Sequence, residues 1–442
     1  MGRYSLIGTQ PSLIFQYQKG QTTLFFPARR KKVVSGNPTQ ILKKLLRERK
    51  VLPEPGSGPF AGGAIGFVGY ESKKLFEPSL PQRPVEDLGL PWMYFLFLEE
   101  GVLFDHQKES AFLFCIDRNS SKALRRLEIL QKKLLKNLKS KILMVPREKK
   151  NKKSAALSLA SSVTRKQFLS WVKETKKYIG RGDIFQANLS QRLTFPMRDS
   201  VESVYEKLKE LNPSSFFGIL DAGNFQILSG SPERLLKLEG RQLETRPIAG
   251  TRSRSLDPKK DKAVTLDLLL SPKERAEHIM LVDLERNDLG RVAEYGSVVV
   301  DELMTIEDYS HVKHIVSNVR AVLKKGLSAV DAFSAVFPGG TITGTPKIRA
   351  MQIIDELETV ARGPYTGSLG YFSFTGDMDF NIIIRSLVIK NGMAHLQVGA
   401  GIVADSDPQK EYDETLYKAE AVLTAIFGRI RTRALFRKLR SS

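Results

Sequence analysis

Short apolar runs broken by Gly and Pro fill residues 1–117 and predict β-strands. These runs cover residues 3–8, 12–18, 22–27, 62–70, 94–105 and 110–117. A stretch with helical period follows from Ser121 to about Leu143. Residues 146–162 are charged and then small and polar, which indicates an exposed linker. We therefore expect an N-terminal β-rich region over residues 1–145 and a linker over residues 146–163.

Strands and helices alternate after the linker. Thr164 is a candidate N-cap for a helix that extends to Ile179. One face of this helix carries four residues at helical spacing: Phe168, Val172, Thr175 and Ile179. A turn at residues 180–183 then leads into the strand-like run IFQANLSQRLTF. The pattern predicts an α+β fold with large sheets, a main region over residues 164–428 and a basic tail over residues 429–442.

Residues 337–358, FPGGTITGTPKIRAMQIIDELE, combine a turn rich in Gly and Thr with an amphipathic helix. Apolar residues of this helix recur at helical spacing: Ile348, Met351, Ile354 and Leu357. Backbone N–H groups in such a turn, at the positive end of a helix, suit a carboxylate or a phosphate. A glycine turn that only caps a helix is the alternative, and the turn alone does not decide between the two.

The composition is that of a soluble globular protein. Hydrophobic residues make up 41% of the 442 residues and charged residues 26%. The one cysteine, Cys115, excludes a disulfide within the chain and fits a reducing cytosol. No apolar run approaches the roughly 18 residues of a membrane span, and the first ten residues resemble neither a signal nor a transit peptide. We expect a cytoplasmic protein without a membrane partner.

The net charge of +21 raises the question of nucleic-acid binding. Basic residues are scattered, with clusters at residues 29–32, 132–153 and 429–440. No zinc-ligand spacing, helix-turn-helix signal or RNA-recognition aromatic signature accompanies them. A solvated, lysine-rich surface explains the charge better, so no nucleic-acid partner is expected, although a basic scaffold without enzymatic activity stays an alternative. An anionic substrate would gain from the positive field.

Two pairs of glutamates have the spacing that places both carboxylates on one helix face. Glu274 and Glu277 form the first pair, and Glu411 and Glu414 form the second, with Lys418 one turn further on the same face. Taken alone, such pairs are mostly solvated surface. They could instead converge on one Mg²⁺ ion, which prefers about six oxygen ligands and keeps positions open for water and an anionic substrate.

The segment LSGSPERLL places Glu233 after Ser-Pro, at a predicted strand-to-helix turn. In the first turn of a helix, a glutamate is favoured simply by the helix dipole. In a closed site, the same carboxyl would have a raised pKa and could carry a proton near neutrality.

The segment over residues 337–358 resembles the signature of the chorismate-utilising enzymes, which include component I of anthranilate synthase and of aminodeoxychorismate synthase. The resemblance extends from Arg3 to about Phe427 and is strongest from Gly180 onward. It implies a large mixed α/β sandwich of antiparallel sheets flanked by helices, with chorismate as the substrate.

The resemblance assigns roles to the glutamate pairs. The positions that match Glu277 and Glu414 bind Mg²⁺ directly in the family, and those that match Glu274 and Glu411 assist through water. The position of Lys418 pairs with the ring carboxylate of chorismate, which the metal also holds. An electron-withdrawing cation there would help the ring hydroxyl to leave.

The resemblance also implies the groups that carry out the reaction. Glu233 matches the general acid that acts on the C4 hydroxyl, and His314 matches a histidine near the same hydroxyl. Relatives that add water carry a lysine base at the position of Gln186, whereas those that use ammonia carry glutamine. Gln186 therefore favours amination over isochorismate or salicylate synthesis.

The substrate's side arm has its own implied contacts. Arg385 and Tyr365 match the pair that holds the enolpyruvyl carboxylate, for which a guanidinium fork is well suited. Backbone contacts to the substrate are implied at four positions: Gly250, Thr251, Gly399 and Gly401. Ser386 departs from the family, where threonine is usual.

The choice between the two aminating enzymes rests on conflicting features. Ala249 stands where many aminodeoxychorismate synthases carry a lysine that attacks C2, and alanine there is typical of anthranilate synthases. FPGGTITGTPK and GDMDFNIIIR resemble the aminodeoxychorismate form instead. The Leu-Leu-Glu-Ser tryptophan-sensing element is not found before GRYSLIG, and NPSSFFGIL lacks the Pro-Tyr-Met wording of the tryptophan pocket. We favour aminodeoxychorismate synthase component I, with anthranilate synthase component I as the alternative.

The source of ammonia is expected to lie outside this chain. The only cysteine, Cys115, lacks the Gly-rich nucleophile-elbow context that a glutaminase needs. The expected partner is therefore a separate glutamine amidotransferase subunit (component II).

Overall fold

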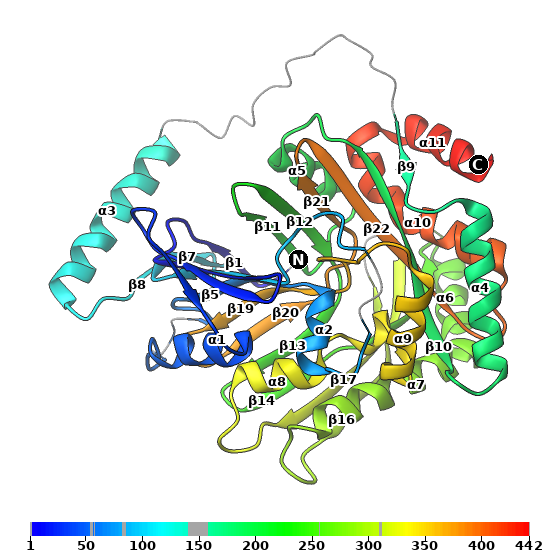
Figure 1. The fold of residues 1–442 in the computed structure, drawn as a ribbon, viewed down its shortest axis with the longest axis horizontal. Coiled ribbons are helices and arrows are strands. Elements are labelled where there is room, and N and C mark those ends of the chain that lie inside the picture. The colour runs from blue at the N-terminus through cyan, green and yellow to red at the C-terminus, as the bar shows by residue number, and fades with distance from the viewer. Residues whose placement is uncertain are drawn as a thin grey trace.

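The computed structural model describes residues 2–53, 56, 58–81, 85–139, 158–255, 257–308 and 312–441, and Figure 1 shows their arrangement. Within these residues the strands form three sheets, and all pairs of named strands are antiparallel. Helices flank the sheets, so the predicted α+β fold of antiparallel sheets and flanking helices is confirmed.

The largest sheet of the described residues has 12 strands. Its strands are, in spatial order, β15 (Ile248–Ser253), β17 (Val312–Val322), β14 (Gln242–Thr245), β13 (Arg234–Glu239), β20 (Met378–Asn381), β19 (Ser368–Ser373), β5 (Gly63–Val68), β6 (Met93–Leu98), β2 (Leu13–Gln18), β3 (Gln21–Phe25) and β4 (Lys31–Val34), with β16 (Val299–Asp308) paired to β17. Strands of residues 13–98 thus form one part of this sheet and strands of residues 234–381 form the other, and the two parts join where β5 pairs with β19.

The other described strands form a seven-stranded and a three-stranded sheet. The seven-stranded sheet contains, in order, β11 (Phe216–Asp221), β12 (Phe225–Ser231), β21 (Ser386–Lys390), β22 (Met393–Ile402), β10 (Gln186–Pro196) and β18 (Gly344–Thr345), with β9 (Ala160–Ser161) paired to β10. The three-stranded sheet contains β1 (Tyr4–Ile7), β7 (Glu100–Asp105) and β8 (Ser110–Cys115).

The helices of the described residues connect and cover these sheets. They are α1 (Pro38–Arg47), α2 (Lys73–Phe76), α3 (Ser120–Lys139), α4 (Arg165–Gly180), α5 (Val201–Leu211), α6 (Pro258–Leu270), α7 (Pro272–Gly290), α8 (Ala329–Val336), α9 (Lys347–Leu357), α10 (Pro408–Phe427) and α11 (Arg429–Ser441), with 3₁₀ turns η1 (Tyr70–Ser72) and η2 (Gly340–Ile342). None of them combines the length and the apolar character that a bilayer crossing requires.

Strand β10 gives the seven-stranded sheet one apolar and one polar face. Because side chains alternate along a strand, Leu189, Leu193 and Phe195 share a face, and they pack in a cluster with residues of α4, α5 and α10. The positions between them are polar: Gln186, Asn188, Ser190, Arg192 and Thr194. Figure 1 shows α4 and α10 close to β10 and β22. The helices therefore cover the apolar face, and the polar face can line a site.

The two large sheets pack against each other through a small apolar cluster. Phe67 and Tyr94 of the 12-stranded sheet contact Phe225, Ile227 and Val388 of the seven-stranded sheet. Since Val388 also lines a small cavity with Arg192 and Gln397, the polar face of β10 and β22 points toward the larger sheet. The apolar cluster closes part of the space between the sheets, and polar groups line another part.

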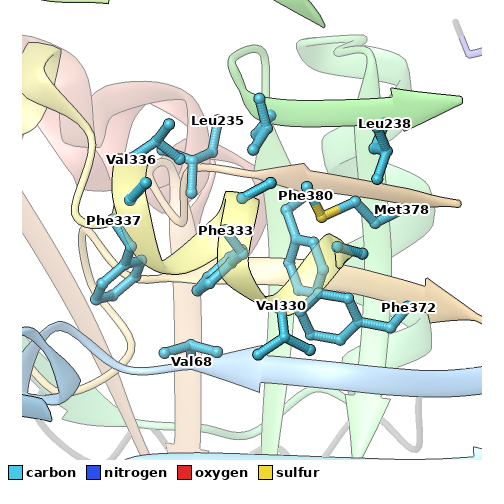
Figure 2. Packing of buried hydrophobic residues seen from close by; sticks show 14 of the residues in the cluster. Val68, Leu235, Leu238, Val330, Phe333, Val336, Phe337, Phe372, Met378 and Phe380 are labelled. Carbon is cyan, nitrogen blue, oxygen red and sulfur yellow. The ribbon is translucent and has the colours of Figure 1, made fainter. Parts of the chain in front are cut away.

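Helix α8 anchors the core on the 12-stranded sheet. Figure 2 shows Phe333, from α8, pointing toward Phe372 and Phe380 on the strands beneath. The ring centroids of Phe333 and Phe380 are 4.8 Å apart, and those of Phe372 and Phe380 are 4.7 Å apart. Such clusters bury large apolar areas, and they hold the strands that carry the site.

Replacing Phe333 by Ala is expected to lower the free energy of unfolding by about 3–5 kcal/mol, because the lost contacts leave a cavity in a close-packed core. Urea denaturation followed by circular dichroism measures this change. Tyr295→Ala is the matched control, since that aromatic ring is fully exposed and should cost less than about 0.5 kcal/mol. Equal losses in the two variants would contradict the assignment of the core.

The N-terminal region departs from the prediction in one respect. Residues 1–117 were predicted as short strands, and the structure adds helical segments largely outside the predicted strands, namely α1 at residues 38–47 and η1 with α2 at residues 70–76. The start of α1 has a local cause, because the Asn37 side chain accepts a hydrogen bond from the Thr39 backbone N at 2.9 Å and Pro38 follows it. The helix signal was present but lay among strong strand signals.

Helix α3, strand β9 and helix α4 lie around the predicted linker. The helix expected over residues 121–143 is α3, which is described to Lys139. Residues 140–157 lie outside the described residues, so the predicted linker can be followed only from residue 158, where β9 pairs with β10. Helix α4 follows its predicted Thr164 N-cap, whose hydroxyl accepts from the Gln167 backbone N at 3.2 Å. The predicted region boundaries themselves stay predictions.

The basic tail forms helix α11. Its apolar residues Leu435, Phe436 and Leu439 are buried, and the Tyr412 hydroxyl donates to the Leu439 carbonyl at 3.0 Å. The tail is thus attached to α10 on the side of the seven-stranded sheet, where Figure 1 shows it.

Candidate active site

Glu233 lies where the chain passes from one large sheet to the other. It follows β12 of the seven-stranded sheet and precedes β13 of the 12-stranded sheet. The expectation of a strand-to-helix turn is therefore wrong, because a strand follows and pairs with β20. The Glu233 backbone N donates to the Ser231 hydroxyl at 3.2 Å, and its carbonyl accepts from Ile382 N at 3.0 Å. These bonds fix the residue at the junction of the sheets.

The Glu233 carboxyl has the electrostatic properties of a general acid. The residue is 7% exposed, and burial raises the pKa of this carboxyl to about 7. The Thr341 hydroxyl and the positive charges of Arg385 and Lys418 act in the opposite direction. The group therefore holds a proton over a substantial part of the neutral range and can donate it inside the site.

His314 on β17 is held as a neutral ring. Its Nδ1 atom lies 3.2 Å from the Gly250 carbonyl oxygen. Because a carbonyl can only accept, Nδ1 must carry the hydrogen in this bond. Burial lowers the pKa of the ring, and Arg385 acts in the same direction. Nε2 of the neutral ring then presents a lone pair that can accept a hydrogen bond from a hydroxyl.

Gly250 connects His314 to the first glutamate pair. It lies at a register shift between β15 and β17 with φ of +60°, a conformation that favours glycine. A Cβ atom here would come within 3.0 Å of Glu274 Oε2. Thr251, the next residue, is aligned with His314 across the two strands. The structure thus brings Gly250, Thr251, Glu274 and His314 together.

A second group of predicted residues gathers where β10 and β22 pair. A Cβ atom at Gly401 would lie 2.5 Å from Gln186 Nε2, and one at Gly399 would lie 2.7 Å from Tyr365 Oη. Both positions therefore need glycine, because the neighbouring polar side chains occupy the space that a Cβ would fill. Lys418 joins this group from α10, since its Nζ donates to the Gly399 carbonyl at 3.0 Å.

Arg385 supplies positive charge near Glu233 and His314. It precedes β21, and its charge acts on Glu233 and on His314. Its φ of +51° is uncommon for a residue with a side chain, and such conformations concentrate at functional sites.

The two glutamate pairs lie on helices, as predicted. Glu274 and Glu277 are in the first turns of α7, and Glu411 and Glu414 are in the first turns of α10. Glu274 Oε1 accepts from Arg252 at 3.0 Å, and Glu414 Oε1 is 2.8 Å from the Nζ atom of Lys418. Helix α7 packs on β15 and β17, and α10 packs on β22, so the pairs flank the two groups described above.

The donor chemistry of these pairs suits Mg²⁺. Carboxylate oxygens are hard ligands, and Mg²⁺ in enzymes is usually held by only one or two of them together with water and substrate. Across the described ranges, no three acidic, histidine or cysteine side chains form a metal-holding cluster by themselves. The magnesium site stays a prediction.

Several residues of the site were not singled out in the sequence. Asn188 lies beside Gly399, and Thr341 acts on Glu233. Arg362 is buried and pairs with Glu358, and its Nη2 atom also donates to the Asn188 carbonyl at 2.6 Å. The alternating polar positions of β10 were a visible signal for Asn188. Arg362 had no local signal, because distant segments create its environment. Thr341 was not named, although it lies in the turn that was singled out at residues 337–358.

Known proteins resemble this chain over nearly its whole length. Residues 2–424 match the chorismate binding enzyme family. The chain is 41% identical to anthranilate synthase component 1 of Acetivibrio thermocellus, over 96% of this chain and 87% of the relative. It is 42% identical to aminodeoxychorismate synthase component 1 of Bacillus subtilis (strain 168), over 96% of this chain and 89% of the relative.

A solved structure agrees with these relatives. Anthranilate synthase component I from Streptococcus pneumoniae TIGR4 superposes with a TM-score of 0.83 at 36% sequence identity, covering 95% of this chain and 92% of that chain. MenF, the menaquinone-specific isochorismate synthase from Escherichia coli, has the same fold with a TM-score of 0.65 at 19% identity, covering 95% and 89%. The resemblance inferred from residues 337–358 is confirmed, and the chain belongs to the chorismate binding enzyme family.

Proposed function

We propose that this protein is the chorismate-aminating component I of aminodeoxychorismate synthase. It converts chorismate and ammonia to 4-amino-4-deoxychorismate, for the synthesis of 4-aminobenzoate and folate in the cytoplasm. A separate glutamine amidotransferase subunit supplies the ammonia. The names of the relatives at about 40% identity support an aminating enzyme of one of two kinds.

Gln186 is the observation that carries the proposal of amination. It is 4% exposed and faces Gly401 of β22, so a neutral carboxamide occupies the position of the lysine base in water-adding relatives. A carboxamide cannot remove a proton from water at neutral pH. Ammonia has a free lone pair and needs no such base.

The residues of the site divide the reaction between them. Glu233 donates its proton to the C4 hydroxyl, and the C4–O bond breaks with release of water. The nitrogen of ammonia forms the new C4–N bond with its lone pair and then loses one proton, which restores the proton on Glu233. One water is released for each ammonia consumed. Neutral His314 accepts a hydrogen bond from the hydroxyl, and Arg385 with Tyr365 holds the enolpyruvyl carboxylate.

Magnesium is the proposed cofactor. Glu277 and Glu414 would hold the ion, and Glu274 and Glu411 would support it through water. When bound, it supplies positive charge against the ring carboxylate of chorismate. Lys418 contributes a second positive charge on the same side.

Anthranilate synthase component I is the second candidate, and Ala249 favours it. This residue is buried on β15, and no lysine occupies its position for attack on C2. The segment FPGGTITGTPK favours the first candidate, and it contributes Thr341 beside Glu233. Without a lysine at 249, C4 amination would use direct attack by ammonia.

The product distinguishes the two candidates. We expect the purified chain with chorismate, Mg²⁺ and ammonium to give 4-amino-4-deoxychorismate, identified by mass, with pyruvate near background in a lactate dehydrogenase assay. Addition of a separate aminodeoxychorismate lyase should then release pyruvate. Fluorescent anthranilate formed with equimolar pyruvate by the chain alone would overturn this choice in favour of anthranilate synthase.

A further inference from the structure

Two carboxamide oxygens at the start of β10 are buried without a partner. Gln186 is 4% exposed and Asn188 is 8% exposed, and neither Gln186 Oε1 nor Asn188 Oδ1 has a hydrogen bond within the described part of the chain. The residues are two positions apart on the strand, so their side chains share one face. Buried acceptors are nearly always paired in folded proteins, so two neighbouring exceptions point to a missing donor.

Two backbone hydrogen bonds fix the position of Asn188. Asn188 N donates to the Thr343 carbonyl at 2.8 Å, and the Asn188 carbonyl accepts from Arg362 Nη2 at 2.6 Å. The Asn188 carboxamide is then directed over Gly399, where a Cβ would lie 2.6 Å from Oδ1. Tyr365 Oη lies against the same point, at 2.7 Å. The unpaired acceptors therefore lie among the residues that are predicted to contact the substrate.

The missing group must donate hydrogen bonds, whereas the charged groups of chorismate accept them. The carboxylates of chorismate accept hydrogen bonds and would be repelled by carboxamide oxygens. Lys418, the cationic side chain of this group, donates to the Gly399 carbonyl and pairs with Glu414. Ammonia carries three N–H donors and one lone pair. When the lone pair points to the ring, the N–H groups point away and need acceptors. Two oxygens on neighbouring positions of one strand face meet that need.

We propose that Asn188, together with Gln186, binds the attacking ammonia and directs its lone pair to the ring. This inference rests on the proposed function, because it assigns the second substrate of the same site. Gln186 was already assigned by its resemblance to ammonia-using relatives, whereas Asn188 is assigned by its unpaired oxygen and its position over Gly399.

The test is the kinetics of Asn188→Leu, which keeps the branched shape and the number of side-chain heavy atoms and removes the acceptor. With saturating chorismate and Mg²⁺ at mildly alkaline pH, KM for ammonia should rise about tenfold, the effect of a lost hydrogen bond to a buried group. KM for chorismate should change by less than about twofold, since the Asn188 backbone bonds that support the site remain. Asn188→Ala, which cannot overpack the site, is the second variant and should behave in the same way.

Gln191→Leu is the matched control. Gln191 is a fully buried carboxamide on the same strand, but it lies on the opposite face, where Nε2 donates to the Thr415 hydroxyl at 2.6 Å. This variant should keep its KM for ammonia even where its melting temperature falls. Any general effect of removing a buried carboxamide from β10 is thereby separated from ammonia binding.

An unchanged KM for ammonia in Asn188→Ala would overturn the inference, as would an equal rise in the two KM values, which would assign Asn188 to chorismate. The outcome for the wild-type enzyme separates this inference from the proposed function. If the wild type forms no aminated product, the proposed function fails and the inference fails with it. If the wild type aminates chorismate and the variants keep their KM for ammonia, only the inference fails.

Discussion

Replacing Glu233 by Gln is expected to lower kcat for amination by about 10²–10⁴-fold, the usual contribution of a positioned general acid. Glutamine keeps the size and the polarity of the side chain but cannot donate a proton to the departing C4 hydroxyl. The measurement is the initial rate of product formation at saturating chorismate and ammonia, with KM values recorded beside it. A variant within about tenfold of the wild-type kcat would contradict the role of Glu233 as the acid.

The pH dependence of the wild type gives an independent check on Glu233. Burial raises the pKa of this carboxyl to about 7, so the protonated, active form is lost as the pH rises through about 7. At a fixed concentration of free ammonia, kcat for amination should therefore fall above that pH. In Glu233→Gln the remaining activity should lack this step, because no proton is exchanged at that position.

The same substitution should affect stability in the opposite direction. A carboxyl whose pKa is raised from the ordinary 4.5 to about 7 stabilises the fold fully below pH 4.5, and this contribution is lost as the pH rises through about 7. Glutamine has no charge to bury, so Glu233→Gln should melt at the same temperature as the wild type or higher at pH 8. A lower melting temperature there would show that the substitution damages packing, and the loss of activity would then need another explanation.

Replacing Glu277 by Gln is expected to lower the rate at saturating Mg²⁺ by more than about 100-fold, because loss of even an outer-shell partner of a metal commonly costs 10- to 100-fold. Glu414→Gln should have the same effect from α10. A carboxamide oxygen is a weaker ligand for a hard cation than a carboxylate. The measurement is the rate as a function of Mg²⁺ concentration, with Mg²⁺ binding followed by calorimetry in the presence of chorismate.

Asp283→Asn is the matched control for the magnesium prediction. This carboxylate is on the same helix as Glu277, but its side chain is 75% exposed and pairs with Arg286 one turn away. Its removal should leave the Mg²⁺ dependence unchanged. A wild-type rate and a wild-type Mg²⁺ affinity in Glu277→Gln would contradict the metal assignment. The roles proposed for Glu233 and Gln186 would not be affected, because they rest on other contacts.

The parts of the fold that were predicted from the sequence depend on local patterns. Helix α4 has its N-cap and its apolar face within 16 consecutive residues, and β10 alternates between polar and apolar residues except at Gln191. The prediction of a strand-to-helix turn at Glu233 was wrong because the deciding contact is not local. Whether a strand or a helix follows Ser-Pro-Glu depends on β20, which lies more than 140 residues later in the chain and pairs with β13. The hydrophobic pattern around Glu233 therefore cannot predict this strand pairing.

In the candidate site, too, some features were predicted from local motifs and others depend on distant parts of the chain. Its candidate members, such as His314 and Lys418, were predicted from family motifs, and the structure added the contacts that join them to Gly250 and Gly399. The unpaired oxygen of Asn188 could not be found from the sequence, because a hydrogen-bond deficit appears only after every neighbour is in place.

The order of strands in the large sheet has a consequence for how the chain folds during synthesis. Strand β5, at residues 63–68, pairs on one side with β6 and on the other with β19, at residues 368–373. About 300 residues must therefore leave the ribosome before β5 gains its second neighbour. Until then the nascent chain presents an open, largely apolar edge, which is the kind of surface that pairs with other chains and that chaperones cover.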